Sequence, residues 1–382
     1  MEKIPFATKR SEIIAFLGKN SKILNDNDEP VHIIMERTTS KTGDAYVEFL
    51  TKEAAERAVH RHNEATQRGR QPRIGNRPAD LAVVNQEHLM QQLFPTAKAV
   101  NWSATRATIK EPVEGQPWTI FKGFVSEEEL TLLIKHVEQP SRSPYAKDCP
   151  QRPYECMIST IRKYPWYMSE HITIKQRQMV FNTTLRLTEI LRRVIDRGVT
   201  RGDERGRVNR AGEVVLNEQL FKRLVYTALA CTGFSAYQKN EIARVAGWSN
   251  EKVVHGFNQP PNAGAWVHLH TSAPRPGMPL DLLGWYIAVI RERTTDMVRR
   301  LPNQERMEME QLGTKTDMTF GYLFWVMKIP KVEQLELMTL KQVYNMEYNA
   351  IKTVLEGAAA DAHANRLRYA LPTAETDEDS ET

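Results

Sequence analysis

The chain has 382 residues, of which 41% are hydrophobic and 26% charged, as in a globular protein with room for two or three domains. No stretch approaches the roughly 18 apolar residues of a membrane span, the start lacks the apolar run of a secretory signal, and three cysteines are too few for a disulfide framework. The net charge is +5, and about +10 once the acidic residues 375–382 are set aside, which favours a polyanionic partner.

The first elements expected are a short helix over residues 8–17 and a hairpin. The helix has Ile13, Ile14, Phe16 and Leu17 behind a polar start and ends at Gly18. An apolar run at 31–35, a polar turn and the octamer 42–49 predict the two strands. Since successive side chains of a strand point to opposite faces, Ala45, Val47 and Phe49 are expected in the core, with Tyr46 on an open face.

A second helix and a last strand complete the predicted N-terminal domain. Residues 52–62 place alanines and Val59 on one helical stripe, and residues 77–84 are the candidate strand. The order helix, strand, strand, helix, strand predicts an α+β domain that ends near residue 95.

The octamer and its flanks resemble an RNA-binding family. Gly43-Asp44-Ala45-Tyr46-Val47-Glu48-Phe49, preceded by Ile4-Pro5-Phe6, is similar to the quasi-RNA-recognition motifs of the heterogeneous nuclear ribonucleoprotein F and H type. Residues 85–95 resemble the segment that follows this motif in fungal RNA-binding proteins. The segments 143–145, 149–155 and 164–166 resemble the helical half of the same fungal proteins, to which no activity is attached.

The resemblance implies a ferredoxin-like RNA-recognition-motif domain over residues 1–95 and a nuclear protein, with the cytoplasm as the alternative. It implies single-stranded RNA as the partner, with other ribonucleoprotein components as further candidates. Asp44 stands where an aromatic residue would stack a base, so RNA is expected at loops. The expected contacts are the rings of Phe6 and Tyr46 and the cations Arg37 and Lys41.

The resembled fold needs a first strand in the middle of its sheet, and this chain offers only Met1 to Ile4 for it. Unpaired backbone groups at a buried edge cost about 1–3 kcal/mol each. A misplaced chain start, another segment in the gap or a marginal domain are the alternatives, and the first is preferred.

The remainder is expected to be a linker and a helical domain. Residues 96–117 are rich in Pro and small residues and predict a linker packed through Trp102 and Trp118. Residues 118–368 predict an α-helical domain that begins with the capping box Ser126 to Glu129, and 369–382 predict a disordered acidic tail. Its longer helices are expected at 173–197, 217–230, 235–246, 281–301 and 339–356, the last ending at Gly357.

Two segments of the helical domain invite comparison with RNA-binding surfaces. Residues 142–167 interleave basic and aromatic side chains, including Arg142, Tyr145 and Lys147, as a single-strand platform does. Two-sided helices give the same pattern, and this structural interpretation is favoured. Residues 201–212 form an arginine-rich loop (Arg201, Arg205, Arg207 and Arg210) that is equally consistent with phosphate contacts and with a solvated linker.

Catalytic and metal motifs are lacking. The spacings of His268 and His270 and of Cys149 and Cys156 do not match a structural zinc site, and no phosphate-binding glycine loop or nucleophile elbow occurs. We therefore expect no enzyme, metal or cofactor. The leading hypothesis is single-stranded RNA binding by the N-terminal domain, with a helical module for partners or further RNA contacts. The alternative is a protein-interaction scaffold whose recognition-motif domain no longer binds RNA.

Overall fold

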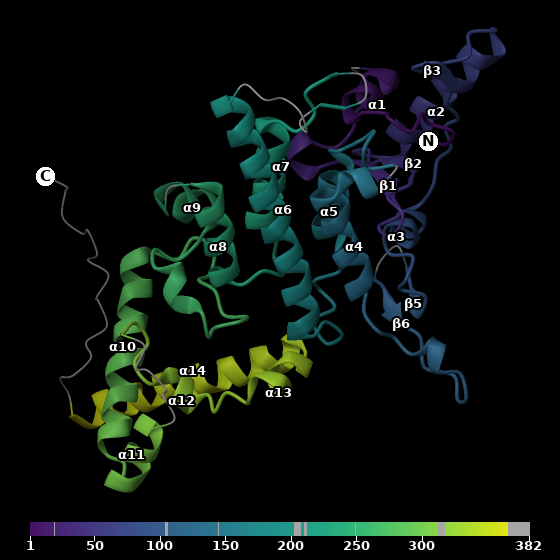
Figure 1. Cartoon of the computed structure of the whole chain (residues 1–382). Coiled ribbons are helices and arrows are strands. Elements are labelled where there is room, and N and C mark those ends of the chain that lie inside the picture. Colours follow the sequence, from purple (N-terminus) through teal and green to yellow (C-terminus); the bar gives the residue numbers. More distant parts are fainter. Residues whose placement is uncertain are drawn as a thin grey trace, which may run out of the picture. The chain divides into compact units, whose positions relative to one another are not determined.

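The computed structural model describes residues 1–18, 20–103, 106–143, 145–201, 208–209, 212–248, 250–311 and 318–365. Most of the predicted arginine-rich loop (202–207 and 210–211) and the predicted acidic tail lie outside the described residues. The fold is mixed and mostly helical, and its strands form small two-stranded sheets (Figure 1). This confirms a mixed, mainly helical chain, but the described residues do not form a complete ferredoxin-like sheet.

The chain forms two compact units. The first comprises Met1–Phe234 and Gln238–Asn250, and the second comprises Ser235–Tyr237 and the chain from Glu251 onward. The boundary predicted at residues 95–118 therefore does not coincide with a boundary between compact units. The reason is long-range packing, because the N-terminal strands share buried contacts with helices from the region predicted as a separate domain.

The predicted hairpin is present near the start of the first unit. Strands β1 (Val31–Met35) and β2 (Thr42–Val47) pair antiparallel, with His32 opposite Tyr46. One face of this hairpin packs on α1 (Arg10–Leu17) and α2 (Lys52–Gln67), both of which were predicted, although α2 extends beyond residue 62. Their shared apolar core contains Ile4, Ile13, Leu17, Val31, Ile33, Ala45, Ala58, Ile74 and Ala79.

The opposite face of the hairpin is also covered. Helix α5 (Arg152–Lys163) packs along β1, and α3 (Gln86–Leu93) contributes His88, whose ring lies 5.7 Å from that of Tyr46. The hairpin is therefore the middle of three layers. The face predicted to be open is closed by a helix that begins more than 100 residues later.

The last predicted strand is mostly absent as a paired strand. Its first two residues form β4 (Arg77–Pro78), which pairs with β3 (Arg73–Ile74) in a separate small hairpin. Asp80 then bonds Glu2, with Glu2 N to Asp80 O at 3.0 Å and Asp80 N to Glu2 O at 3.3 Å. Met1 in turn exchanges two bonds with Ala45 of β2, at 2.8 and 3.0 Å. The first two residues thus bridge β2 and the segment at Asp80 by backbone hydrogen bonds on both sides.

The segment predicted as a linker contains regular structure among its described residues. It contains the hairpin of β5 (Val100–Asn101) and β6 (Thr108–Ile109), and Trp102 is buried with its ring 5.8 Å from that of Phe94. The expectation for Trp102 is confirmed, whereas Trp118 is 71% exposed and does not anchor the segment.

The helices that complete the first unit follow the predicted pattern. Helix α4 (Glu127–Glu138) has the predicted capping box, in which Ser126 Oγ accepts from the Glu129 amide and Glu129 accepts from the Ser126 amide. The others are α6 (Ile174–Arg201), α7 (Glu218–Leu229) and α8 (Ala236–Ala246). Each lies within a few residues of its predicted bounds.

The second unit is helical, with α9 (Asn250–Phe257), α10 (Leu280–Arg299), α11 (Asn303–Gln311), α12 (Leu323–Val326), α13 (Val332–Leu337) and α14 (Leu340–Asn365). Its core gathers Trp266, Leu283, Ile290, Phe320, Leu323 and Val354. The predicted end of the last helix at Gly357 is wrong. The guanidinium of Arg293 packs beside this glycine, where an added Cβ would lie 3.1 Å from a guanidinium nitrogen, and Arg293 also pairs with Asp361 one turn later.

Among the described residues, none of the helices combines the length and apolar character needed to cross a lipid bilayer.

Candidate nucleic-acid interface

Tyr46 does not present an open ring face. Its side chain lies between β1 and α3, and the residue is only 9% exposed. Burial raises the pKa of its phenol, with smaller contributions from the nearby carboxylates of Asp44 and Glu2. A base therefore has no room to stack on this ring, and the predicted role of Tyr46 does not fit the structure.

A polar contact between the hairpin and α5 lies on the same covered face. His32 Nδ1 is 2.9 Å from the Ser159 hydroxyl, and His32 Nε2 is 2.9 Å from a carboxylate oxygen of Glu48. Lys163 of α5 also binds Glu48, at 2.5 Å. Burial lowers the pKa of His32, so the imidazole is neutral, donates from Nε2 to Glu48 and accepts at Nδ1 from Ser159.

The Glu48 carboxylate is held in its charged form. Burial alone would raise its pKa, but the hydrogen bond from His32 and the ion pair with Lys163 outweigh that effect and lower the pKa to about 2. The sheet face is therefore occupied by a satisfied polar network of the chain itself, and it is not a vacant platform for RNA.

Arg37 is buried rather than available to phosphate. Its side chain is 3% exposed, and one guanidinium nitrogen lies 3.1 Å from a carboxylate oxygen of Glu129. The other donates to the Leu93 carbonyl at 2.8 Å and to the Thr160 hydroxyl at 2.9 Å. Arg37, predicted to contact RNA, is instead held inside the first unit, where Glu129 neutralises its charge.

The two loops to which the resemblance assigns RNA contacts lie against one later segment, residues 141–143 and 145–149. In the hairpin loop, Ser40 Oγ is 2.7 Å from Ser143 Oγ and accepts from the Ala146 amide at 3.1 Å. At the other loop, the ring of Phe6 lies 5.2 Å from that of Tyr145. The sequence alone did not indicate that this segment would join both loops.

These contacts define a candidate interface, named here the loop surface and made of Phe6, Lys41, Arg142, Tyr145 and Lys147. Tyr145 is 41% exposed, the three cations are exposed, and Phe6 is half-buried. None of the three cations takes part in an ion pair within the described part of the chain. Exposed rings beside free positive charges are what a single-stranded nucleic acid requires.

Much of the rest of the basic and aromatic stretch is buried, although Arg162 and Tyr167 are exposed. Arg152, Tyr154 and Tyr164 are buried, and Arg152 binds Glu155 at 2.6 Å. Its exposed members are fewer than the sequence pattern implies.

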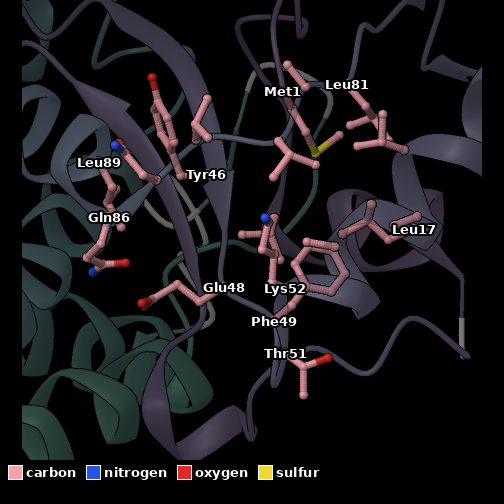
Figure 2. A pocket seen from close by; sticks show the side chains of 18 residues that line it. Met1, Leu17, Tyr46, Glu48, Phe49, Thr51, Lys52, Leu81, Gln86 and Leu89 are labelled. Carbon is pink, nitrogen blue, oxygen red and sulfur yellow. The ribbon is translucent and has the colours of Figure 1, made fainter. Parts of the chain in front are cut away.

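A cavity of about 240 Å³ lies beside β2, on the side away from β1. Figure 2 shows that Met1, Leu17, Phe49 and Leu81 gather around one part of it, while Tyr46, Glu48, Gln86 and Leu89 lie in the other. Residues of α2 and the chain from 81 to 84 complete the lining. This cavity was not predicted from the sequence, although the sequence did indicate that the first strand, in the middle of the expected sheet, is missing.

No group of three or more His, Cys, Asp or Glu side chains within the described residues could hold a metal ion. Cys149, Cys156 and Cys231 are free and buried, and burial raises the pKa of each thiol, that of Cys231 to about 11. His268, considered above as a possible metal ligand, packs its ring against Phe324.

Two family models match the chain. One, described as a domain of unknown function (DUF8400), matches residues 1–104, and the other, a domain of unknown function (DUF8399), matches residues 121–248. No curated protein and no solved structure matches the chain. The two matched segments together span nearly the whole of the first compact unit.

Proposed function

We propose that the protein binds single-stranded RNA at the loop surface. The observation that carries the proposal is the ring pair of Phe6 and Tyr145, which lies beside three exposed cations. Together with the contact between Ser40 and Ser143, this pair joins the two loops implicated by the resemblance to one basic segment. An aromatic ring stacks a base of any sequence, and the neighbouring cations neutralise phosphate. The positive charge of the chain outside its acidic end supports the same partner.

The loop surface differs from the site implied by the resemblance in two of its four residues. Phe6 and Lys41 are retained. Arg37 and Tyr46 are omitted because both are buried, and Arg142, Tyr145 and Lys147 replace them. The proposal thus keeps RNA as the ligand and moves its position from the sheet to the loops.

The test is binding of the full chain to labelled G-rich, U-rich and mixed single-stranded RNAs over a range of salt concentrations. The triple variant Lys41→Ala, Arg142→Ala, Lys147→Ala should lower the slope of log affinity against log salt by about 2, because each phosphate contact on a single strand contributes about 0.7. Tyr145→Ala should cost about 1–3 kcal/mol of binding if a base stacks on the ring.

Matched controls come from elsewhere in the chain. The triple variant Lys98→Ala, Arg106→Ala, Lys110→Ala removes the same three charges from exposed positions outside the loop surface. Tyr348→Ala removes a ring that is 50% exposed and, like Tyr145, is paired with another ring. RNA affinity that falls equally in test and control variants, or that is absent at low salt, would exclude the loop surface as the site.

A second candidate function, that of a protein-interaction module, is favoured by one specific observation. The cavity beside β2 is bordered by the free side of β2 and by residues 81–84, and within the described part of the chain neither border makes a backbone hydrogen bond into the cavity, which is a feature of sites that bind extended peptides.

A further inference from the structure

Four exposed arginines lie within ten residues of one another, at the end of α2 and on the hairpin of β3 and β4. This group is named here the arginine hairpin and consists of Arg68, Arg70, Arg73 and Arg77. Residues 65–79 contain neither aspartate nor glutamate, and the next acid along the chain, Asp80, is paired with Lys3 at 2.6 Å. Within the part of the chain that the structure describes, no ion pair includes a member of the arginine hairpin. Four positive charges therefore stand together without a neutralising side chain.

The core of the first unit holds this hairpin in place. Strands β3 and β4 pair through Ile74 and Arg77, and Ile74 is 3% exposed within the apolar core that includes α1. Gly75 takes a left-handed φ of +54° in the turn, which a glycine adopts without strain. Arg73 donates to the Asn76 carbonyl at 3.5 Å, a bond that leaves its charge uncompensated. Arg73 and Arg77 therefore stand on a fixed support, so that binding a polyanion does not first require the backbone to order.

The arginine hairpin lies next to the loop surface. A Cβ added at Gly75 would lie 3.9 Å from Pro5 Cγ, so the turn packs against the residue that precedes Phe6. The ring of Phe6 in turn contacts that of Tyr145. Strand β3 also packs beside α1, which begins at Arg10, shortly after the same loop. One bound molecule can therefore extend from the rings of the loop surface onto the arginine hairpin.

The two surfaces differ in what they can recognise. The loop surface combines rings with cations, which is the requirement of a single strand. Residues 65–79 contain no Phe, Tyr or Trp, so the arginine hairpin offers contacts to phosphate and no ring on which a base could stack. A guanidinium donates two parallel hydrogen bonds to a phosphate, a geometry that lysine lacks. Such a surface fits a nucleic acid whose bases are already stacked on one another and whose phosphates lie outside, which is a duplex.

We propose that the arginine hairpin binds the phosphates of an RNA duplex that continues from the single strand held at the loop surface. The inference rests on the proposed function, because the single strand is what places the duplex beside the hairpin. Double-stranded RNA is recognised mainly through its shape, its 2′-hydroxyls and its phosphates, which requires no base-stacking ring. The preferred ligand is therefore a stem with an adjoining unpaired segment, either a loop or an overhang.

The test compares three labelled RNAs on the full chain by fluorescence anisotropy: a short single strand, a blunt stem, and a junction RNA that joins the two. The junction RNA should bind about tenfold or more tightly than the single strand, and its affinity should fall more steeply with salt, because phosphate contacts are added. The quadruple variant Arg68→Ala, Arg70→Ala, Arg73→Ala, Arg77→Ala should lose this gain. Its affinity for the single strand should stay within about twofold of the wild type, which also shows that the variant is folded.

A matched control removes four arginines from elsewhere in the chain. Arg193, Arg197, Arg291 and Arg300 are exposed, and within the described residues none of them is in an ion pair. Their quadruple substitution by alanine should leave the gain of the junction RNA unchanged. An equal loss in both quadruple variants would show that the total charge of the chain, and not the arginine hairpin, attracts the stem, and would overturn the proposal.

Failure of this inference and failure of the proposed function give different results. If Tyr145→Ala weakens the single strand but the junction RNA binds no more tightly than that strand, the loop surface stands and the assignment of the duplex is overturned. If the single strand does not bind, the proposed function fails, and the junction proposal fails with it. A blunt stem that binds as tightly as the junction RNA would likewise overturn the preference for a junction.

The acidic end of the chain is another polyanion that could occupy the arginine hairpin, since residues 375–382 contain five acids. A synthetic peptide of these residues should not displace the junction RNA when it is added at the same concentration of negative charge. Displacement by the peptide would show that the arginine hairpin binds acidic segments in general, and would overturn its assignment to RNA.

Discussion

Arg37 and Glu129 form a buried ion pair that joins the β1–β2 loop to the first turn of α4, at a separation of 3.1 Å. Glu129 also accepts from Thr96 and from the Ser126 amide, and the His136 ring nitrogen lies 3.0 Å from the Arg37 carbonyl. Both carboxylate oxygens of Glu129 and both terminal guanidinium nitrogens of Arg37 therefore have partners. The pair fixes the turn of the hairpin to the helical part of the first unit.

Arg37→Ala should lower the stability of the first unit by about 3–5 kcal/mol, since removing one partner leaves Glu129 charged and uncompensated in the interior. The thermal transition of that unit, followed by differential scanning calorimetry, is the measurement. Lys41→Ala, four residues further along the same loop and exposed, should change stability by no more than about 0.5 kcal/mol. A similar, small effect of both substitutions would show that the buried pair does not stabilise the fold.

The stability of the first unit should fall in weak acid because of His32. Burial lowers its pKa in the folded protein below the ordinary value of 6.5, so the unfolded chain binds more protons than the folded one at any pH between the two values. The contribution of neutral His32 to the free energy of unfolding is therefore fully present above pH 6.5. It declines as the pH falls below that value, by up to about 1.4 kcal/mol per pH unit. His32→Gln should flatten this decline, while His60→Gln, which changes an exposed histidine of α2, should not.

The lowered pKa of Glu48 predicts a second loss of stability of the first unit at lower pH. Its pKa is about 2 in the folded protein against 4.5 for a free glutamate, so the stabilisation that it provides is present above pH 4.5 and is lost as the pH falls toward 2. Glu48→Gln should be less stable than the wild type at pH 7, and the difference should be several times smaller at pH 2.5. Urea unfolding at the two pH values measures the difference, and a constant difference would contradict the assignment.

Two glycines should respond to alanine substitution with opposite signs. At Gly233 an added Cβ would lie 2.0 Å from the Trp166 ring, so Gly233→Ala should destabilise the first unit by about 1–3 kcal/mol or more. At Gly284, in α10, an added Cβ meets no atom within 4 Å, so Gly284→Ala should stabilise the second unit by about 0.4–1 kcal/mol. Calorimetry of the two variants gives both values, and a stabilised Gly233→Ala protein would be inconsistent with the close packing.

The native protein should react slowly with thiol reagents. All three cysteines are buried, and burial raises the pKa of each thiol, which depletes the reactive thiolate at neutral pH. Titration with a thiol-specific chromogenic reagent should detect almost no thiols in the native state and three after unfolding in guanidinium. Rapid modification of one cysteine in the native protein would place that thiol at an accessible surface.

The sequence predicted the elements whose causes are local. Alternating apolar residues identified β2, and the Ser126 to Glu129 spacing identified the start of α4. In each case the residues that carry the signal lie within a few positions of one another. Trp102 was expected to be buried, whereas the exposure of Trp118 was not foreseen. Burial of a single aromatic residue depends on neighbours that composition does not reveal.

The errors in the predicted site have distant causes. Tyr46 was assigned to an open face because its own strand leaves that face free, and the covering helix α5 begins at Arg152. Arg37 was assigned to phosphate because a cation in a polar loop is usually solvated, yet its partner is 92 residues away. Gly357 was taken as a helix end, although the packing of Arg293 beside it accounts for a glycine inside α14.

The middle position of the hairpin has a consequence for synthesis of the chain. When residues 1–95 have left the ribosome, α5 has not been made, so the His32 and Tyr46 side of the sheet has no cover. Closing it requires contacts across about 130 residues, and such non-local contacts form slowly. A nascent chain of this length exposes strand edges and apolar surface to other proteins in the cell. We therefore expect chaperones to bind it before synthesis is complete.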